Sequence, residues 1–197
     1  LLRGVSRQLN PPPMILLRHG QSEFNVVFTA TRRDPGIIDA RLTALGEEQA
    51  ERAAVAFAGE DIRRIVVSPY TRALQTAAPI ARRLGVPVVV TPTVRERFAF
   101  ACDIGSPRSS LAEAWPQHDF SALEEVWWPA AEESGAEVVA RATRFRAEIA
   151  ALPDWEGTLV VSHWGFILSF TGHSAANGEW VRCDPRAPPP ERVEWHR

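Results

Sequence analysis

Residues 14–25, MILLRHGQSEFN, decide how the fold of this chain is interpreted. The first four residues are apolar and predict a short, buried β-strand. The strand ends abruptly in Arg18 and His19, and Gly20 then permits a sharp turn and a close approach of the backbone to a ligand. The polar residues that follow are typical of a loop or the opening of a helix. This ending predicts a site of chemistry, provided that the chain supplies partners for His19.

Three more apolar runs, at residues 65–67, 86–90 and 158–161, predict further buried strands. Apolar residues at helical spacing predict helices over residues 43–58, 69–84 and 134–152, and a short apolar helix is expected over residues 165–172. Ser68 and Pro69 are expected to be the cap and the first residue of the second of these helices. Continuous apolar strands that alternate with helices are typical of parallel sheets buried on both faces. The predicted fold class is therefore α/β, with a mainly parallel central sheet and helices on both faces.

The remaining segments predict the domain organisation. Residues 98–133 show no regular period and are expected to form a small cap insert within a single domain that spans residues 14–197. Asn177 and Gly178 form a turn pair that is expected to join edge strands near residues 179–183 and 192–196. Residues 1–13, which end in three prolines, are expected to form a flexible N-terminal extension.

Composition excludes several classes of function. The 197-residue chain has a net charge of −2, so no global charge attracts it to nucleic acid or to anionic membranes. It contains no apolar run near the roughly 20 residues of a membrane-spanning helix. Cys102 and Cys183 lie too far apart for a metal or redox motif, which favours a reducing cytoplasm. We therefore expect a cytoplasmic protein that binds neither nucleic acid nor membranes.

Charged side chains follow the ends of the predicted strands. In an open α/β sheet, ligands bind outside the carboxyl ends of the strands. Five residues fall at those ends or open the next helix: Arg18, His19, Arg72, Glu96 and His163. Taken singly, each has an ordinary structural role, such as a surface ion pair or a hydrogen-bonded histidine. Their joint placement on one rim of the sheet predicts a catalytic site.

This set of side chains suits phosphoryl transfer. Two guanidinium groups can fork onto the oxygens of a phosphoryl group. One imidazole can attack phosphorus and form a covalent intermediate, while a second stabilises the developing charge. A carboxylic acid can protonate the leaving oxygen and then activate water. A zinc site on His19 and His163 is disfavoured, because zinc takes three or four ligands and the two arginines would repel it.

Three blocks of sequence carry a family resemblance. They are residues 17–25 (LRHGQSEFN, which contains the RHG motif), 68–77 (SPYTRALQTA) and 161–165 (VSHWG). These blocks resemble the signature motifs of the histidine phosphatase superfamily, also called the phosphoglycerate mutase-like family. Leu42, Thr43, Gly46 and Gln49 are similar to the first helix of that family. The resemblance covers most of residues 14–175, in the family's order and spacing, and implies a phosphoglycerate mutase-like fold.

The resemblance also implies residue roles. His19 would be the phosphorylated nucleophile. The phosphate pocket would consist of Arg18, Arg72 and His163. Asn25 stands where the family has a residue that helps to bind substrate. Glu96 matches the usual proton donor, with Asp103 as the alternative because the family places its acid variably. Trp164 departs from the more usual glycine after the second histidine, which either reshapes the pocket wall or only fills space.

The family contains both phosphatases and mutases. Its phosphoglycerate mutases resemble one another in a longer cap and in a Glu-Arg-His-Tyr-Gly-like run, whereas here Glu96 and Arg97 are followed by FAFA. We therefore expect a phosphomonoesterase that hydrolyses a small phosphorylated substrate through a phosphohistidine and releases inorganic phosphate. No metal or other cofactor is expected. The alternatives are mutase-type phosphoryl transfer and a non-catalytic protein that binds a phosphorylated ligand.

Overall fold

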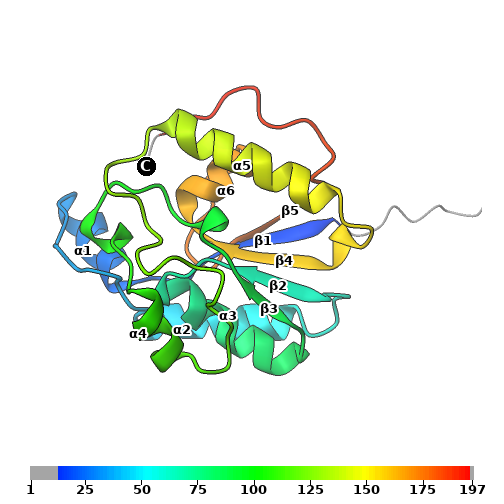
Figure 1. The fold of residues 1–197 in the computed structure, drawn as a ribbon, viewed down its shortest axis with the longest axis horizontal. Helices are drawn as coiled ribbons and strands as arrows, with labels where there is room; N and C mark the ends of the chain where they lie inside the picture. Colours follow the sequence, from blue (N-terminus) through cyan, green and yellow to red (C-terminus); the bar gives the residue numbers. More distant parts are fainter. Residues whose placement is uncertain (1–12, 196–197) are drawn as a thin grey trace, which may run out of the picture.

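The computed structural model describes residues 13–195 and contains a five-stranded sheet (Figure 1). The strands are β1 (Met14–Arg18), β2 (Arg64–Val67), β3 (Val88–Val90), β4 (Thr158–Ser162) and β5 (Trp180–Cys183). Their order is β3-β2-β4-β1-β5, and only β5 runs antiparallel to its neighbour. The predicted mainly parallel α/β sheet is confirmed. The predicted N-terminal extension lies outside the described residues, except for Pro13.

Helices cover both faces of the sheet (Figure 1). They are α1 (Glu23–Thr31), α2 (Ala44–Ala56), α3 (Thr71–Leu84), α4 (Arg108–Ala114), α5 (Gly135–Ala150) and α6 (Trp164–Thr171). Short 3₁₀ turns are η1 (Pro92–Val94), η2 (Ala101–Asp103) and η3 (Trp155–Gly157). In Figure 1, α5 and α6 lie above the sheet, and α2 and α3 lie below it. Over the described range 13–195, no helix is both long and apolar enough to cross a membrane.

The alternation of side chains along each strand divides the core into two layers. Leu17, Val67 and Val161 face the cluster that contains Phe57 and Leu74 from α2 and α3. The neighbouring strand residues face the opposite layer with α5 and α6; this layer includes Leu16, Val66, Val160, Phe145 and Phe166. Both faces of the sheet are therefore buried, which explains why the strands are continuously apolar in sequence.

The start of α3 differs from the prediction. The helix begins at Thr71, so Pro69 is not its first residue, and Tyr70 occupies the capping position without a side-chain hydrogen bond. The cap comes instead from Asp39, whose carboxylate accepts hydrogen bonds from the Thr71 backbone N–H at 2.9 Å and its hydroxyl at 2.6 Å. A partner 32 residues away supplies this cap, so the local sequence could not reveal it.

The chain ends also differ from the prediction in part. The strand expected near residues 179–183 is present as β5, but it pairs with β1. The prediction of a second edge strand is wrong for residues 192–195, which form no strand. His196 lies outside the described residues. Gly178 does adopt a left-handed turn conformation, with φ of 72°. The chain from this turn therefore returns to the central sheet rather than forming a separate hairpin.

Residues 98–133, the cap segment, divide between the site and the core. Its first residues pass through η2 beside the carboxyl ends of the strands. Further along, Leu111, Phe120, Leu123 and Trp127 are buried in the same cluster as α2 and α3. The Trp127 ring packs edge-on against Tyr70, with 4.7 Å between centroids. The tryptophan therefore covers the core, and only the beginning of the segment reaches the predicted site.

Candidate active site

Strand pairing brings the two predicted histidines together. Arg18 at the end of β1 lies opposite Ser162 at the end of β4. The His19 backbone N–H donates to the Ser162 carbonyl at 3.0 Å, so the residues that follow each strand are neighbours. The His19 and His163 rings lie 5.1 Å apart between centroids, and both residues are almost completely buried. Two blocks of sequence separated by more than 140 residues thus form one site.

The turn after β1 determines which ring nitrogen of His19 carries the proton. The Gly20 carbonyl lies 2.7 Å from His19 Nδ1, and a carbonyl can only accept, so Nδ1 carries the proton. The lone pair of this tautomer is on Nε2. Gly20 itself is needed for packing, since a Cβ there would lie 2.4 Å from the Gly46 carbonyl oxygen in α2. The structure thus adds a packing reason for this glycine to the turn and the close approach to a ligand that the sequence predicts.

The Asp103 carboxylate and a backbone carbonyl hold the Arg72 side chain in place. Its Nη1 donates to the Cys102 carbonyl at 2.8 Å, and its Nη2 lies 3.1 Å from Asp103 Oδ1. Asp103 also accepts hydrogen bonds from the Ala99 and Phe100 backbone N–H groups at 3.1 and 3.0 Å. Burial raises the pKa of the Asp103 carboxyl to about 6, and Glu96 adds to the rise, while Arg72 and the two N–H groups oppose it.

Arg18 and Asn25 lie on the other side of His19. Arg18 Nη1 donates to the Ala175 carbonyl at 2.8 Å. Asn25 Oδ1 accepts from the Ser22 backbone N–H at 3.0 Å, from its hydroxyl at 2.9 Å, and from Asn177 Nδ2 at 3.1 Å. The contact from the Ser22 backbone N–H, together with that from the Asn25 backbone N–H to the Ser22 hydroxyl at 3.3 Å, forms the capping box of α1. The three contacts to Oδ1 occupy the amide oxygen of Asn25, so a ligand would meet its NH₂ group.

His163 is the most enclosed of the predicted residues. Its Nε2 lies 2.8 Å from the Ser68 hydroxyl, while its Nδ1 has no hydrogen-bond partner among the side and main chains that the structure describes. Burial holds the pKa of His163 well below its usual value, and the nearby charges of Arg72 and His19 lower it further. His163 is therefore neutral at neutral pH.

Glu96 sits against the N-terminus of α6. Its Oε1 accepts from the Gly165 and Arg97 backbone N–H groups, each at 2.8 Å. A Cβ at position 165 would lie 2.5 Å from the same oxygen, so a larger residue there would require the Glu96 carboxylate to move. The backbone therefore fixes the position of Glu96, which the predicted role of proton donor requires.

One small cavity joins most of the predicted residues. Its lining includes Arg18, His19, Asn25, Arg72, Glu96 and Asp103. His163 does not line it but backs the His19 ring. Further walls come from Ser22, Phe24, Phe100 and Cys102, which the sequence analysis did not assign to the site. Phe24 and Phe100 pack together at 5.3 Å, a contact between distant segments that no local pattern signals.

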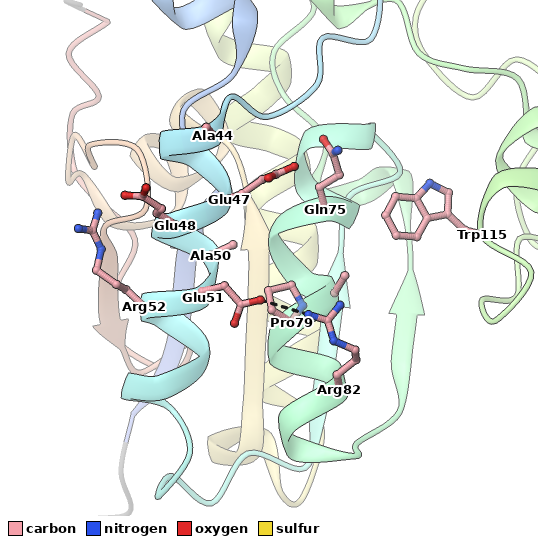
Figure 2. Close-up of a pocket in the computed structure, with 11 residues that line it drawn as sticks. Ala44, Glu47, Glu48, Ala50, Glu51, Arg52, Gln75, Pro79, Arg82 and Trp115 are labelled. Atoms are coloured by element: carbon pink, nitrogen blue, oxygen red, sulfur yellow. Dashed lines mark hydrogen bonds and ion pairs between the residues drawn. The ribbon is translucent and has the colours of Figure 1, made fainter.

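A wider hollow of about 1370 Å³ lies between α2 and α3 (Figure 2). Glu51 and Arg82 form an ion pair across it at 3.2 Å, and Trp115 stands at one side. Its charged side chains are exposed, and it contains none of the predicted catalytic residues. The larger hollow is therefore not the candidate site. The buried histidines, arginine and carboxylates favour the smaller cavity as the candidate.

The chain is similar to known proteins in sequence. A family model described as histidine phosphatase superfamily (branch 1) matches residues 14–180. Glucosyl-3-phosphoglycerate phosphatase of Mycobacterium tuberculosis is 30% identical over 174 residues, 80% of this chain and 73% of that relative. The probable phosphoglycerate mutase GpmB of Proteus mirabilis is 31% identical over 158 residues, 75% of this chain and 67% of that relative.

Solved structures agree with these relatives. The mycobacterial glucosyl-3-phosphoglycerate phosphatase in complex with VO3 aligns with a TM-score of 0.61 at 25% identity. The alignment covers 86% of this chain and 89% of that structure. The relatives include phosphatases that act on small phosphorylated compounds, as the motifs predict. This chain belongs to the histidine phosphatase superfamily.

Proposed function

We propose that this protein is a phosphomonoesterase that works through a phosphohistidine at His19. The observation that carries the proposal is that His19 lies in one cavity with two arginines and two carboxylates. The hydrogen bond from Nδ1 to the Gly20 carbonyl makes Nε2 the nucleophilic nitrogen. Arg18 and Arg72 bind the phosphoryl oxygens. The ring N–H at Nδ1 of His163 donates a hydrogen bond to the same phosphoryl group.

The first half of the reaction transfers the phosphoryl group to the enzyme. His19 Nε2 forms a bond to phosphorus while the bond from phosphorus to the leaving oxygen breaks. Glu96, in its protonated form, gives its proton to that oxygen, and the alcohol leaves. The Asn25 NH₂ group is available to hold a phosphoryl oxygen. The products of this step are phospho-His19, ionised Glu96 and a free alcohol.

The second half returns the enzyme to its first state. Glu96 accepts a proton from a water molecule, whose oxygen attacks phosphorus as the bond to His19 Nε2 breaks. Inorganic phosphate leaves, and Glu96 is again protonated. A mutase would instead return the phosphoryl group to a second alcohol, so the acceptor distinguishes the two activities.

The leaving group is proposed to be a small anionic alcohol. Hollows of about 740 and 930 Å³ adjoin the phosphate cavity, and both are lined by Phe28, Arg32 and Trp164. The Arg32 guanidinium lies 4.9 Å from the centre of the Phe28 ring, which brings a positive charge to both hollows. One relative is named for glucosyl-3-phosphoglycerate, an ester whose leaving group carries a carboxylate. In this arrangement Trp164 is part of the substrate wall.

The partners and location follow from the same proposal. The partners are a small phosphomonoester and inorganic phosphate. The location proposed is the cytoplasm, where the unpaired Cys102 and Cys183 would stay reduced.

Hydrolysis of p-nitrophenyl phosphate tests the reaction. We expect His19→Ala to lose activity by more than about a thousandfold while keeping its fold, because the nucleophile is gone. After a rapid quench, the wild-type protein is expected to carry a phosphoryl label that is stable in alkali and labile in acid. Full activity in His19→Ala would contradict the mechanism. Binding of phosphate without turnover across a broad ester panel would instead support the non-catalytic alternative.

A panel of phosphomonoesters tests the leaving group. We expect Arg32→Ala to raise KM for esters with a carboxylate on the alcohol and to leave neutral esters almost unchanged. An equal change for both kinds of ester would contradict the anionic leaving group. Transfer of the phosphoryl group to an added phosphoglycerate, in place of phosphate release, would identify a mutase.

A further inference from the structure

We propose that Asp103 takes up a proton when an oxyanion enters the phosphate cavity, and that its carboxylic acid then hydrogen-bonds the bound group. This inference rests on the proposed function only in taking the cavity as the phosphate site. It adds a second proton-carrying acid to that site, distinct from Glu96. Binding of phosphate would then be linked to pH through the protein as well as through the ligand.

The contacts of Asp103 explain how its carboxylate is held. Oδ1 lies 3.1 Å from Arg72 Nη2, and the Cys102 thiol lies 3.6 Å from the same oxygen. Oδ2 accepts from the backbone N–H groups of Ala99 and Phe100. The residue is 2% exposed. These donors stabilise the ionised carboxylate although water is almost excluded.

An incoming oxyanion changes this balance. The proposed phosphate ligand Arg72 is the group that neutralises Asp103, so a phosphoryl group and this carboxylate would share one guanidinium. Two negative groups in a buried space repel each other strongly, and protonation of one relieves the repulsion. Oδ2 stays with its two backbone donors, so the proton belongs on Oδ1. There it can be donated to an oxygen of the ligand.

Of the other charged groups around Asp103, some raise its pKa and others lower it. The titratable and charged groups that face it are Arg72 and Tyr70 from the start of α3, Cys102 from η2, Glu96, and Arg18 and His19 at the end of β1. The pKa of Asp103 already stands at about 6, raised first by burial and then by Glu96. One more negative group beside it would carry this pKa past neutrality.

The linkage has a definite sign. Between the pKa of Asp103 in the free protein and its higher value in the complex, each oxyanion binds together with a proton. Affinity should therefore fall with rising pH, by up to about tenfold per pH unit. The proton is released again when phosphate leaves, so the cycle of hydrolysis remains balanced.

Titration calorimetry with sulfate tests the inference without any turnover. Sulfate keeps its charge between pH 6 and 8, so an uptake of protons comes from the protein. Comparison of buffers with different ionisation enthalpies gives the number of protons bound. We expect close to one proton for the wild-type protein and for His19→Gln, and a clear loss of uptake in Asp103→Asn. The pH dependence of sulfate affinity should also flatten in Asp103→Asn.

Several outcomes would overturn the inference. It is wrong if the wild-type protein takes up no proton, or if Asp103→Asn keeps the full uptake while His19→Gln loses it. Asp154→Asn is the matched control, because it removes the partner of Arg64 at 2.5 Å in an ion pair outside the phosphate cavity. That substitution should leave the uptake unchanged.

A spectroscopic measurement covers the case in which Asp103→Asn does not fold. Addition of sulfate to the wild-type protein and to Glu96→Gln should produce the infrared carbonyl band of a protonated carboxylic acid. Absence of this band in Glu96→Gln would overturn the inference, since Glu96 would then be the group protonated. Activity retained by His19→Ala would contradict the proposed mechanism alone and would leave the proton uptake at Asp103 standing.

Discussion

Two arginine–carboxylate ion pairs of this protein have nearly equal lengths and opposite surroundings. Arg72 lies 3.1 Å from Asp103, and each side chain is 3% exposed. Arg82 lies 3.2 Å from Glu51 across the hollow in Figure 2, and these side chains are 69% and 55% exposed. Water solvates the second pair, whereas the first depends on further donors and acceptors in the protein. The distance between the charged groups therefore does not distinguish the two pairs, whereas the burial of the side chains does.

The largest expected difference between the two pairs comes from removing each arginine. Arg72→Gln leaves the buried Asp103 without its counter-charge, so we expect a loss of about 3–5 kcal/mol in the free energy of unfolding. Activity should fall by at least about a hundredfold, because a phosphoryl ligand is lost. Arg82→Gln should cost at most about 1 kcal/mol and leave activity unchanged. Urea unfolding and initial rates on an aryl phosphate measure both effects. Equal effects of the two substitutions would remove the contrast between the pairs.

The carboxylates extend the comparison to catalysis. In Glu96→Gln, Oε1 can still accept from the Gly165 and Arg97 N–H groups, but no proton can be given to the leaving group. We expect kcat to fall by about 10²- to 10⁴-fold for alkyl phosphates, and by less for aryl phosphates that leave readily. Glu51→Gln in the wide hollow is the control and should change neither. If the loss were the same for both leaving groups, Glu96 would be positioning a neighbour rather than supplying a proton.

Two glycines test whether the position of Glu96 matters as much as its charge. Gly165→Ala places a methyl group 2.5 Å from Glu96 Oε1, so the carboxylate must move. We expect kcat to fall by about 10- to 100-fold, with KM changed much less. Gly59→Ala is the control, because a Cβ there meets no atom within 4 Å. Unchanged kcat in Gly165→Ala would mean that the site tolerates a displaced acid.

The same contrast explains how much the sequence predicts. His19 and His163 were predictable, because residues that follow adjacent parallel strands meet at one edge and the apolar runs reveal the strands. The helices α2, α3 and α5 were predictable because each carries one apolar face, whereas α6 was predictable as a short, continuously apolar run, which is buried almost throughout. Local periodicity therefore predicts the strands and helices that carry the candidate site.

The contacts made by irregular segments were not predictable. Asp103 reaches Arg72 from a 3₁₀ turn 31 residues along the chain, and its pairing with Arg72 has no periodic signal. Asp39 caps α3 from a similar distance, which is why Ser68 and Pro69 gave the wrong start for the helix. Phe24 and Phe100 meet only in three dimensions. The residues that form the walls of the site, and the carboxylate that pairs with Arg72, thus depend on tertiary packing.

The smallest expected effect concerns stability against pH. Because burial, with Arg72 and His19, holds the pKa of His163 far below 6.5 in the folded protein, only the unfolded chain gains its proton on acidification. The free energy of unfolding should therefore fall below pH 6.5, by up to about 1.4 kcal/mol per pH unit from this group. Asp103 has the opposite sign between its usual value and about 6, since the folded state then holds the proton.

Urea unfolding at several pH values between 5 and 7.5 separates the two contributions. His163→Gln should make the change in unfolding free energy per unit rise in pH less positive than in the wild-type protein, because the Asp103 contribution is common to both proteins and cancels in the difference between the two slopes. His173→Gln is the matched control, because that side chain is 46% exposed beside Glu179. It should leave most of the slope in place. A slope in His163→Gln as steep as in the wild-type protein would mean that the buried histidine is protonated in the folded state, and His163 could then act as a cation on the phosphoryl group.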